Sequence, residues 1–131
     1  MNSLSRTDPL HPQARQGVSL FNQGEFHAAH ELLEKAWMEV PSPERDLYQG
    51  LLQIGLAYYQ ISRNNYRGAL KMFRRGYRNM DPLGSQMLGI DLDRLRQDAR
   101  KVEEELRRLG PKRMAELGQD LFKPIPEINQ P

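Results

Sequence analysis

Residues 17–41 and 57–82 of this 131-residue chain carry small and large side chains in the same order, forty positions apart. Small residues let two helices cross closely, and an aromatic residue just after the turn packs against both helices. The shared order therefore predicts two related helical hairpins. The matching positions are Gly17, Leu20, Gly24, Phe26, Ala29, Leu33, Ala36 and Pro41 in the first stretch, and Ala57, Gln60, Asn64, Tyr66, Ala69, Phe73, Gly76 and, one residue late, Pro82 in the second.

Apolar residues recur along the chain at the spacing of amphipathic helices, and no segment alternates in the manner of a strand. Glycines and prolines mark the places where the helices end. We expect Ser42 to be the N-cap of the third helix and Pro43 its first residue. The predicted helices cover residues 12–22, 25–39, 43–62, 65–79 and 88–109, with a short helix near 112–118.

The predicted fold class is all-α, a compact bundle of five to six helices built on two tetratricopeptide-like hairpins. The third helix is apolar on most sides, so it should be central, and Gly50 and Ala57 would let another helix approach it closely. Pro124 and Pro126 exclude a helix at the end of the chain. We expect a single domain over residues 1–131, in which 15–80 form the core, 88–109 a separate helix, and 1–11 and 119–131 extended or flexible ends.

Seven apolar residues of the last long helix follow a strict four-three spacing, which is typical of a helix that packs along one seam. The remaining faces of residues 98–108 are charged, as on a solvated helix, and this favours packing of the seam against the same chain. The alternative is a homodimer through Leu88–Leu109. The seam consists of Leu88, Leu92, Leu95, Ala99, Val102, Leu106 and Leu109.

The composition excludes several classes of protein and site. The chain has no cysteine, which excludes disulfides, thiolate metal sites and cysteine nucleophiles. The mean hydropathy is -0.75, and no apolar run approaches the ~18–20 residues of a membrane-spanning helix. No apolar segment follows the first residues, so we expect no secretory signal. These features favour a cytoplasmic protein with no membrane contact and no cofactor, and no glycine-rich phosphate loop indicates nucleotide hydrolysis.

Three groups of residues, taken in order, resemble the signature of a known family. The family is the uncharacterised prokaryotic family called domain of unknown function 309, and the resemblance covers residues 15–80. It implies a small all-helical bundle with no established activity. The groups are Phe21-Asn22-Gln23-Gly24-Glu25-Phe26 with His30-Glu31-Leu32-Leu33-Glu34 and Trp37, then Arg45-Asp46-Leu47-Tyr48-Gln49-Gly50-Leu51-Leu52-Gln53, then Asn65-Tyr66-Arg67-Gly68-Ala69.

Histidine and glutamate residues on the second helix form the sharpest chemical feature of the sequence. Residues three and four apart meet on a helix, so His30 and Glu34 should lie close together, beside Trp37. The favoured interpretation is a structural polar cluster, in which a partly buried His30 bonds to Glu34 and to a glutamine of the central helix. The members of this predicted cluster are His30, Glu31, Glu34, Trp37, Gln49 and Gln53.

Two functional alternatives remain for the same residues. His30 and Glu34 could serve as general acid and base if a pocket lies beside them, because histidine titrates near neutral pH. His27, His30 and Glu34 could instead bind a divalent transition metal, since imidazole and carboxylate groups are suitable ligands. The spacing lacks the two histidines four apart that zinc peptidases use, and a metal would need further ligands from another helix.

The net charge is only +2, yet residues 63–80 contain six basic residues and no acidic one. Like charges three and four positions apart on a helix repel each other, so another group should offset them. Either acids such as Asp91, Asp93 and Asp98 or those of the second helix neutralise them, or they bind an acidic protein or a nucleic-acid backbone. The five cations that share one helix face, here called the basic stripe, are Arg67, Lys71, Arg74, Arg75 and Arg78.

Two functions are compatible with these features, and they belong to different classes. We favour a non-enzymatic interaction module that uses a tetratricopeptide-like groove and the basic stripe. The alternative is a small enzyme or metal-binding protein centred on His30 and Glu34. No nucleic-acid reader motif is present, so a nucleic-acid partner would be bound through its phosphates without sequence specificity.

Overall fold

The computed structural model describes residues 8–128, and the all-α fold class is confirmed. The helices are α1 (Pro12–Asn22), α2 (Phe26–Trp37), α3 (Glu44–Ser62), α4 (Tyr66–Met80) and α5 (Leu92–Arg113). Shorter elements are the strands β1 (Gln86–Met87) and β2 (Ile90–Asp91) and the 3₁₀ turns η2 (Asp81–Leu83), η3 (Met114–Glu116) and η4 (Gln119–Leu121). None of the helices described is both long and apolar enough to cross a bilayer.

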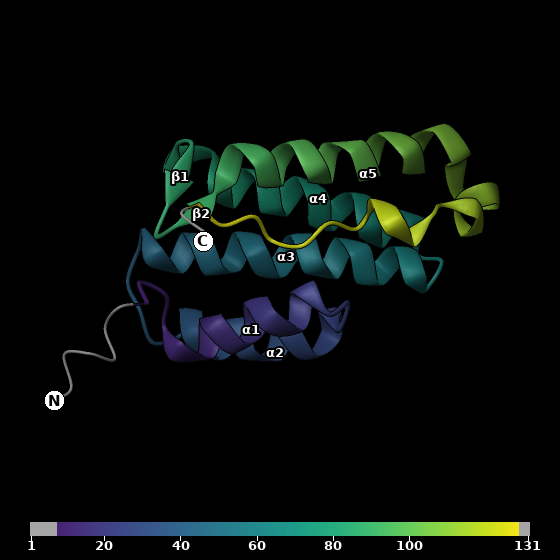
Figure 1. Ribbon diagram of the computed structural model, residues 1–131. Coiled ribbons are helices and arrows are strands. Elements are labelled where there is room, and N and C mark those ends of the chain that lie inside the picture. Colours follow the sequence, from purple (N-terminus) through teal and green to yellow (C-terminus); the bar gives the residue numbers. More distant parts are fainter. Residues whose placement is uncertain (1–7, 129–131) are drawn as a thin grey trace, which may run out of the picture.

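Helix α3 is central, as its apolar faces predict. In Figure 1 the hairpin of α1 and α2 lies on one side of α3, and α4 and α5 lie on the other. Both α2 and α4 pack directly on α3. Its side chains Leu47, Ile54 and Tyr58 are fully buried between these neighbours. A helix covered on several sides must be apolar on several sides, which explains the unusual pattern of this segment.

The two hairpins, α1–α2 and α3–α4, have equivalent turns. The residue at the bend has a positive φ in both, 84° for Gly24 and 58° for Asn64. The backbone bonds that close the turns are also equivalent: at 2.9 Å, Glu25 donates to the carbonyl of Leu20 and Asn65 to that of Gln60. The forty-residue repeat is therefore a repeat of structure, down to the hydrogen bonds of the turn.

Glycines allow α3 and α4 to cross closely at one point. A Cβ atom added at Gly50 would overlap Cγ of Met80, and one at Gly76 would lie 2.8 Å from Cδ1 of Ile54. Either side chain would push the helices apart, so the absence of a side chain at both positions sets their separation. The close approach expected at Gly50 is thus observed, and its partner helix is α4.

The seam of α5 packs inside the chain. Its residues from Leu92 to Leu109 are buried at every seam position. The helix begins at Leu92 rather than at residue 88, because Asp91 accepts the N–H of Arg94 at 3.0 Å and caps the helix there. It is interrupted at Gly110, whose φ is 74°. With the seam covered by its own bundle, the homodimer through Leu88–Leu109 stays a prediction that the single chain does not support.

Two local expectations were wrong. Residues 86–91 form a short antiparallel hairpin, in which Gln86 pairs with Asp91. Its loop residues Leu88 and Gly89 both have positive φ, which suits a two-residue hairpin turn, and strands of two residues are too short to show alternation. At the start of α3, Pro43 occupies the N-cap position and no side chain caps the helix, so Ser42 does not have the expected role.

The end of the chain is extended, as Pro124 and Pro126 predict, and it lies against the bundle. In Figure 1 this segment, drawn in yellow, runs back along α3 toward the β-hairpin. The N–H of Ile125 donates to Oδ1 of Asn22 at 2.8 Å, and Ile125 itself is buried. We call residues 122–128 the tail. The expectations for residues 1–7 and 129–131 lie outside the described residues.

Candidate functional site

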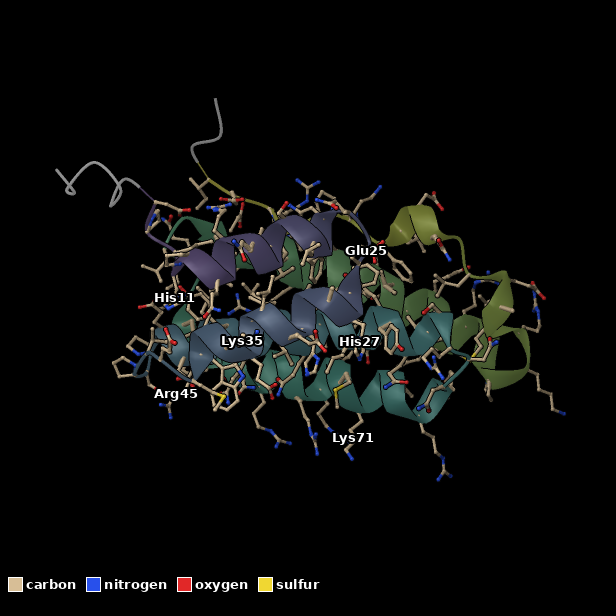
Figure 2. The ribbon with its side chains drawn as sticks, turned by 90° about the horizontal axis from the view of Figure 1, so that it is seen from below. His11, Glu25, His27, Lys35, Arg45 and Lys71 are labelled. Atoms are coloured by element: carbon tan, nitrogen blue, oxygen red, sulfur yellow. The ribbon has the colours of Figure 1, made fainter. Side chains whose placement is uncertain are left out.

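The basic stripe lies along the exposed face of α4. The opposite face of this helix is apolar, with Ala69, Phe73 and Met80 fully buried, so packing fixes the direction in which the cations point. All five side chains of the stripe are exposed. Figure 2 shows Lys71 among the side chains that project from α4 into solvent.

The acids that the sequence suggested as counter-charges are engaged within α5 itself. Asp91 caps this helix at the N–H of Arg94, Asp93 pairs with Arg96 at 3.3 Å, and Asp98 pairs with Arg94 at 3.2 Å. The expectation that they neutralise the stripe is therefore wrong. Over residues 8–128, no ion pair joins the stripe to an acid of α2 either.

Within residues 8–128, the arginines of the stripe have neither a carboxylate nor an aromatic ring as partner. Every other arginine of the described chain has one. Six of them form ion pairs with carboxylates, and three lie over aromatic rings at 5.3–5.8 Å. The ion-paired residues are Arg15, Arg94, Arg96, Arg107, Arg108 and Arg113, and those over rings are Arg45, Arg63 and Arg100. The arginines of the described chain that have no such partner thus all lie on one helix face.

A shallow cavity of about 240 Å³ opens beside the crossing of α3 and α4. It is lined by two amides of α3, Gln49 and Gln53, and by Arg75, Arg78 and Asn79 of α4. Nδ2 of Asn79 donates to Oε1 of Gln53 at 2.6 Å, which links the two helices across the cavity. The stripe therefore ends in a site where cations and amides meet.

The predicted polar cluster around His30 is not connected in the expected way. His30 is half-buried on α2, and its Nδ1 atom is enclosed without a hydrogen-bond partner. Glu31 and Glu34 are exposed, and Gln53 bonds to Asn79 rather than to His30. The expected bonds from His30 to Glu34 and to the glutamines of α3 are therefore wrong.

The metal alternative finds no suitable set of ligands. Within residues 8–128, no three His, Cys, Asp or Glu side chains come close enough together to hold a metal ion. The rings of His27 and His30 lie 5.8 Å apart, and the ring of His27 is tilted against Tyr59 at 5.3 Å. Glu34 does not complete a site with them.

Trp37 is half-buried and covered by a cation. The guanidinium carbon of Arg45, on α3, lies 5.8 Å from the centre of the indole ring. Arg45 also donates to the carbonyl of Val40 at 3.0 Å, which holds it over the ring. Because Arg45, Gln49 and Gln53 follow one another at four-residue spacing on α3, Trp37 lies at the end of the row that leads to the cavity.

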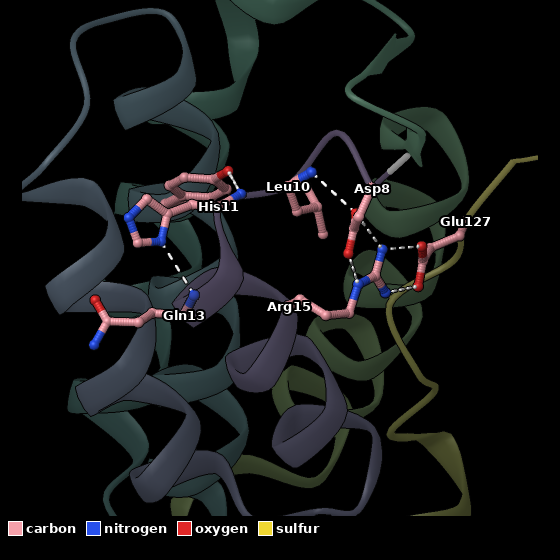
Figure 3. A network of polar contacts seen from close by, with 7 residues as sticks. Asp8, Leu10, His11, Gln13, Arg15 and Glu127 are labelled. Atoms are coloured by element: carbon pink, nitrogen blue, oxygen red, sulfur yellow. Dashed lines mark hydrogen bonds and ion pairs between the residues drawn. The ribbon is translucent and has the colours of Figure 1, made fainter. Parts of the chain in front are cut away.

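A polar network at the start of α1 was not predicted from the sequence. Arg15 of α1 bonds both oxygens of Asp8 at 2.7 and 3.1 Å and both oxygens of Glu127 at 2.8 and 2.9 Å (Figure 3). The two carboxylates raise the pKa of Arg15, and the hydrogen bond from Arg15 lowers the pKa of Asp8. Residues 8 and 127 are far apart in sequence, so no spacing pattern connects them.

This network predicts a contribution to stability that depends on pH. Because its pKa is lower in the folded chain, Asp8 stabilises the fold above its unfolded pKa, about 3.9, and this contribution is lost as the pH falls through the folded pKa. We expect the free energy of unfolding to decline more steeply for the wild type than for Asp8→Asn between about pH 5 and pH 2. Urea titrations at a series of pH values measure the difference, and parallel curves would contradict the expectation.

A cleft of about 450 Å³ was also not predicted from the sequence. It lies between the α1–α2 turn, the end of α3 and the tail, with Phe26, His27, Tyr59 and Phe122 among its walls. Below it, the ring of Tyr58 stacks on Phe122 at 4.7 Å. Its walls come from segments that lie as far apart in sequence as Phe21 and Pro124, so the cleft forms only when the tail packs beside the α1–α2 turn.

The fold and these surfaces define a small all-helical protein made of two repeated hairpins and a fifth covering helix, with one cationic face. Residues 14–72 match the model of the family described as Domain of unknown function (DUF309), which confirms the resemblance carried by the motifs. The match includes most of α1, all of α2 and α3, and the first part of α4.

A curated protein is also similar to this chain. The chain is similar to the uncharacterized protein YpuF of Bacillus subtilis (strain 168), with 32% identity over 91 residues. The aligned region covers 63% of this chain and 52% of that protein, so the chain spans about half the length of this relative. The relative is a bacterial protein, and its name assigns no activity to it.

Proposed function

We propose that this protein is a non-enzymatic interaction module that binds an anionic partner through the basic stripe and a tetratricopeptide-like groove beside α3. The observation that carries the proposal is the contrast among the cations. The other arginines of the described chain have a carboxylate or an aromatic ring as partner, whereas the five cations of α4 have neither.

The physical reason lies in the cost of concentrating charge. Cations three and four apart on one face repel each other, each pair by a few tenths of a kcal/mol. An anionic partner converts this repulsion into attraction, and the field of the stripe speeds its approach. Such binding weakens with salt, because exposed charges are screened.

The module is better supported than an enzyme centred on His30 and Glu34. Glu34 is exposed, and neither His30 nor Glu34 lines either of the two cavities described above, so these cavities place no substrate beside the pair. A cytoplasmic location is part of the same proposal, and it rests on the absence of cysteine.

Reversing three charges tests the proposal. The variant Arg67→Glu, Lys71→Glu, Arg74→Glu should weaken binding of fluorescein-labelled hexaglutamate, or of an oligothymidylate, by about two orders of magnitude at low salt. Fluorescence anisotropy at about 50 mM and about 300 mM salt measures the affinity and its salt dependence.

The matched control carries the same change in net charge elsewhere. Lys101, Lys112 and Lys123 are exposed and lie outside α4, so Lys101→Glu, Lys112→Glu, Lys123→Glu should keep most of the affinity. Equal losses in both triple variants, or no binding of either probe to the wild type, would overturn the proposed function.

A further inference from the structure

The cavity between α3 and α4 owes its position to the crossing of these helices. The close approach at Gly50 and Gly76 brings the flanking residues of the two helices together on the solvent side. Gln49 precedes one glycine and Arg75 precedes the other, and both line the cavity. The long polar side chains around the crossing therefore converge where the backbones are nearest.

The lining has the chemistry of a carboxylate site. Arg75 and Arg78 supply planar donors that can bond both oxygens of a carboxylate, and neither forms an ion pair within residues 8–128. The bond from Asn79 occupies the oxygen of Gln53, which leaves the amide nitrogen of Gln53 as a donor. No acidic side chain is among the residues that line the cavity.

We propose that this cavity binds a carboxylate group of an acidic peptide. Arg75 and Arg78 pair with the carboxylate, and Gln49 and Gln53 add hydrogen bonds from α3. The inference rests on the proposed function and names its partner: the rest of the basic stripe attracts the peptide, and the cavity fixes one of its acidic groups.

The surroundings favour a peptide over a nucleic acid. A peptide backbone presents donors and acceptors, which match the amides of Gln49 and Gln53, whereas a phosphodiester backbone presents only acceptors. Single-stranded nucleic acids also use exposed aromatic rings for stacking. Here the ring of Trp37 is covered by Arg45, and that of Tyr77 lies under Arg100 at 5.3 Å.

The size of the stripe also suits a short extended peptide. From residue 67 to residue 78 the helix rises about 16 Å, at roughly 1.5 Å per residue. An extended peptide covers that distance with about five residues. We therefore use a hexaglutamate labelled at its N-terminus as the probe, and hexaglutamine as the uncharged control.

Two double variants with equal charge change separate the cavity from the stripe. Arg75→Gln, Arg78→Gln removes the cations of the cavity, and Arg67→Gln, Lys71→Gln removes two cations outside it. We expect the first pair to weaken hexaglutamate binding about tenfold more than the second, because only the first removes paired charge-assisted bonds. Gln53→Leu should weaken binding severalfold without any change in charge.

Amidation of the C-terminus of hexaglutamate distinguishes the two sources of carboxylate. If amidation weakens binding to the wild type but not to Arg75→Gln, Arg78→Gln, the cavity binds the terminal carboxylate. If amidation does not weaken binding to the wild type, the cavity binds a glutamate side chain. Either result supports the inference when the two double variants differ. Circular dichroism of every variant confirms that the helices remain.

The opposite results overturn the inference in distinct ways. If both double variants lose affinity equally and Gln53→Leu binds normally, the cavity is not used, while the proposed function stands. If an oligothymidylate binds more tightly than hexaglutamate, the partner is a nucleic acid and the peptide is excluded. If the wild type binds neither probe, the proposed function fails as well.

Discussion

Gly50→Leu is expected to destabilise the protein by about 3 kcal/mol or more. The Cβ alone would overlap Cγ of Met80, which is fully buried, and the carbonyl oxygen of Gly76 lies 3.5 Å away. A leucine therefore requires α3 and α4 to separate over their whole contact. The better helix propensity of leucine offsets about 1 kcal/mol of this loss.

Thermal and urea unfolding followed by circular dichroism measure the change. Because Gly50→Leu could fail to fold, Gly50→Ala provides a milder variant, in which rotation of Met80 relieves part of the overlap. The double variant Gly50→Leu, Met80→Ala provides a rescue, since the leucine then occupies space that the methionine leaves. If the double variant lost as much unfolding free energy as the two single variants together, this result would contradict the close crossing.

Phe21→Ala is expected to cost about 3–5 kcal/mol. The side chain is 2% exposed and contacts two other aromatic rings edge-on, Phe26 at 5.1 Å and Tyr58 at 5.8 Å. It also lies 3.1 Å from the position of a Cβ on Gly55, so it fills the space between α1 and α3. Its removal leaves a cavity that the surrounding helices cannot close without losing other contacts.

Phe122→Ala is the matched control for this prediction. Phe122 belongs to the same aromatic group, since it stacks on Tyr58 and meets Phe26 at 5.7 Å, but it is only half-buried and lies on the tail. We therefore expect about 1–2 kcal/mol for its loss. If the two variants were equally stable, Phe21 would not be part of the core that joins the hairpins.

The helices and the repeat could be predicted because they depend on local periodicity. Small residues at positions such as Ala29 and Gly76 indicate close helix contacts, and the matched turns at Gly24 and Asn64 follow from residues that tolerate positive φ. The hairpin at residues 86–91 could not be predicted in this way. Two residues per strand produce no alternation, and its stability comes from contacts with distant segments.

The candidate sites were predicted only in part, for a similar reason. The basic stripe is a pattern on a single helix, so its geometry was fixed by spacing. The partner of Gln53 could not be predicted from spacing. Asn79 lies twenty-six positions away and pairs with Gln53 only because α3 and α4 cross. The bonds around His30 were assigned to the nearest polar residues, but burial of its Nδ1 atom and exposure of Glu34 separate them.

The tail has a consequence for the cooperativity of unfolding. In an open array of repeats each unit contacts only its neighbours, and the end units fray independently. Here Ile125 bonds to Asn22 and Glu127 bonds to Arg15, so the last described segment holds the first hairpin. Amides of α1 and of the tail should therefore exchange with solvent in one common opening step. We therefore expect the two hairpins and the tail to unfold together rather than one unit at a time.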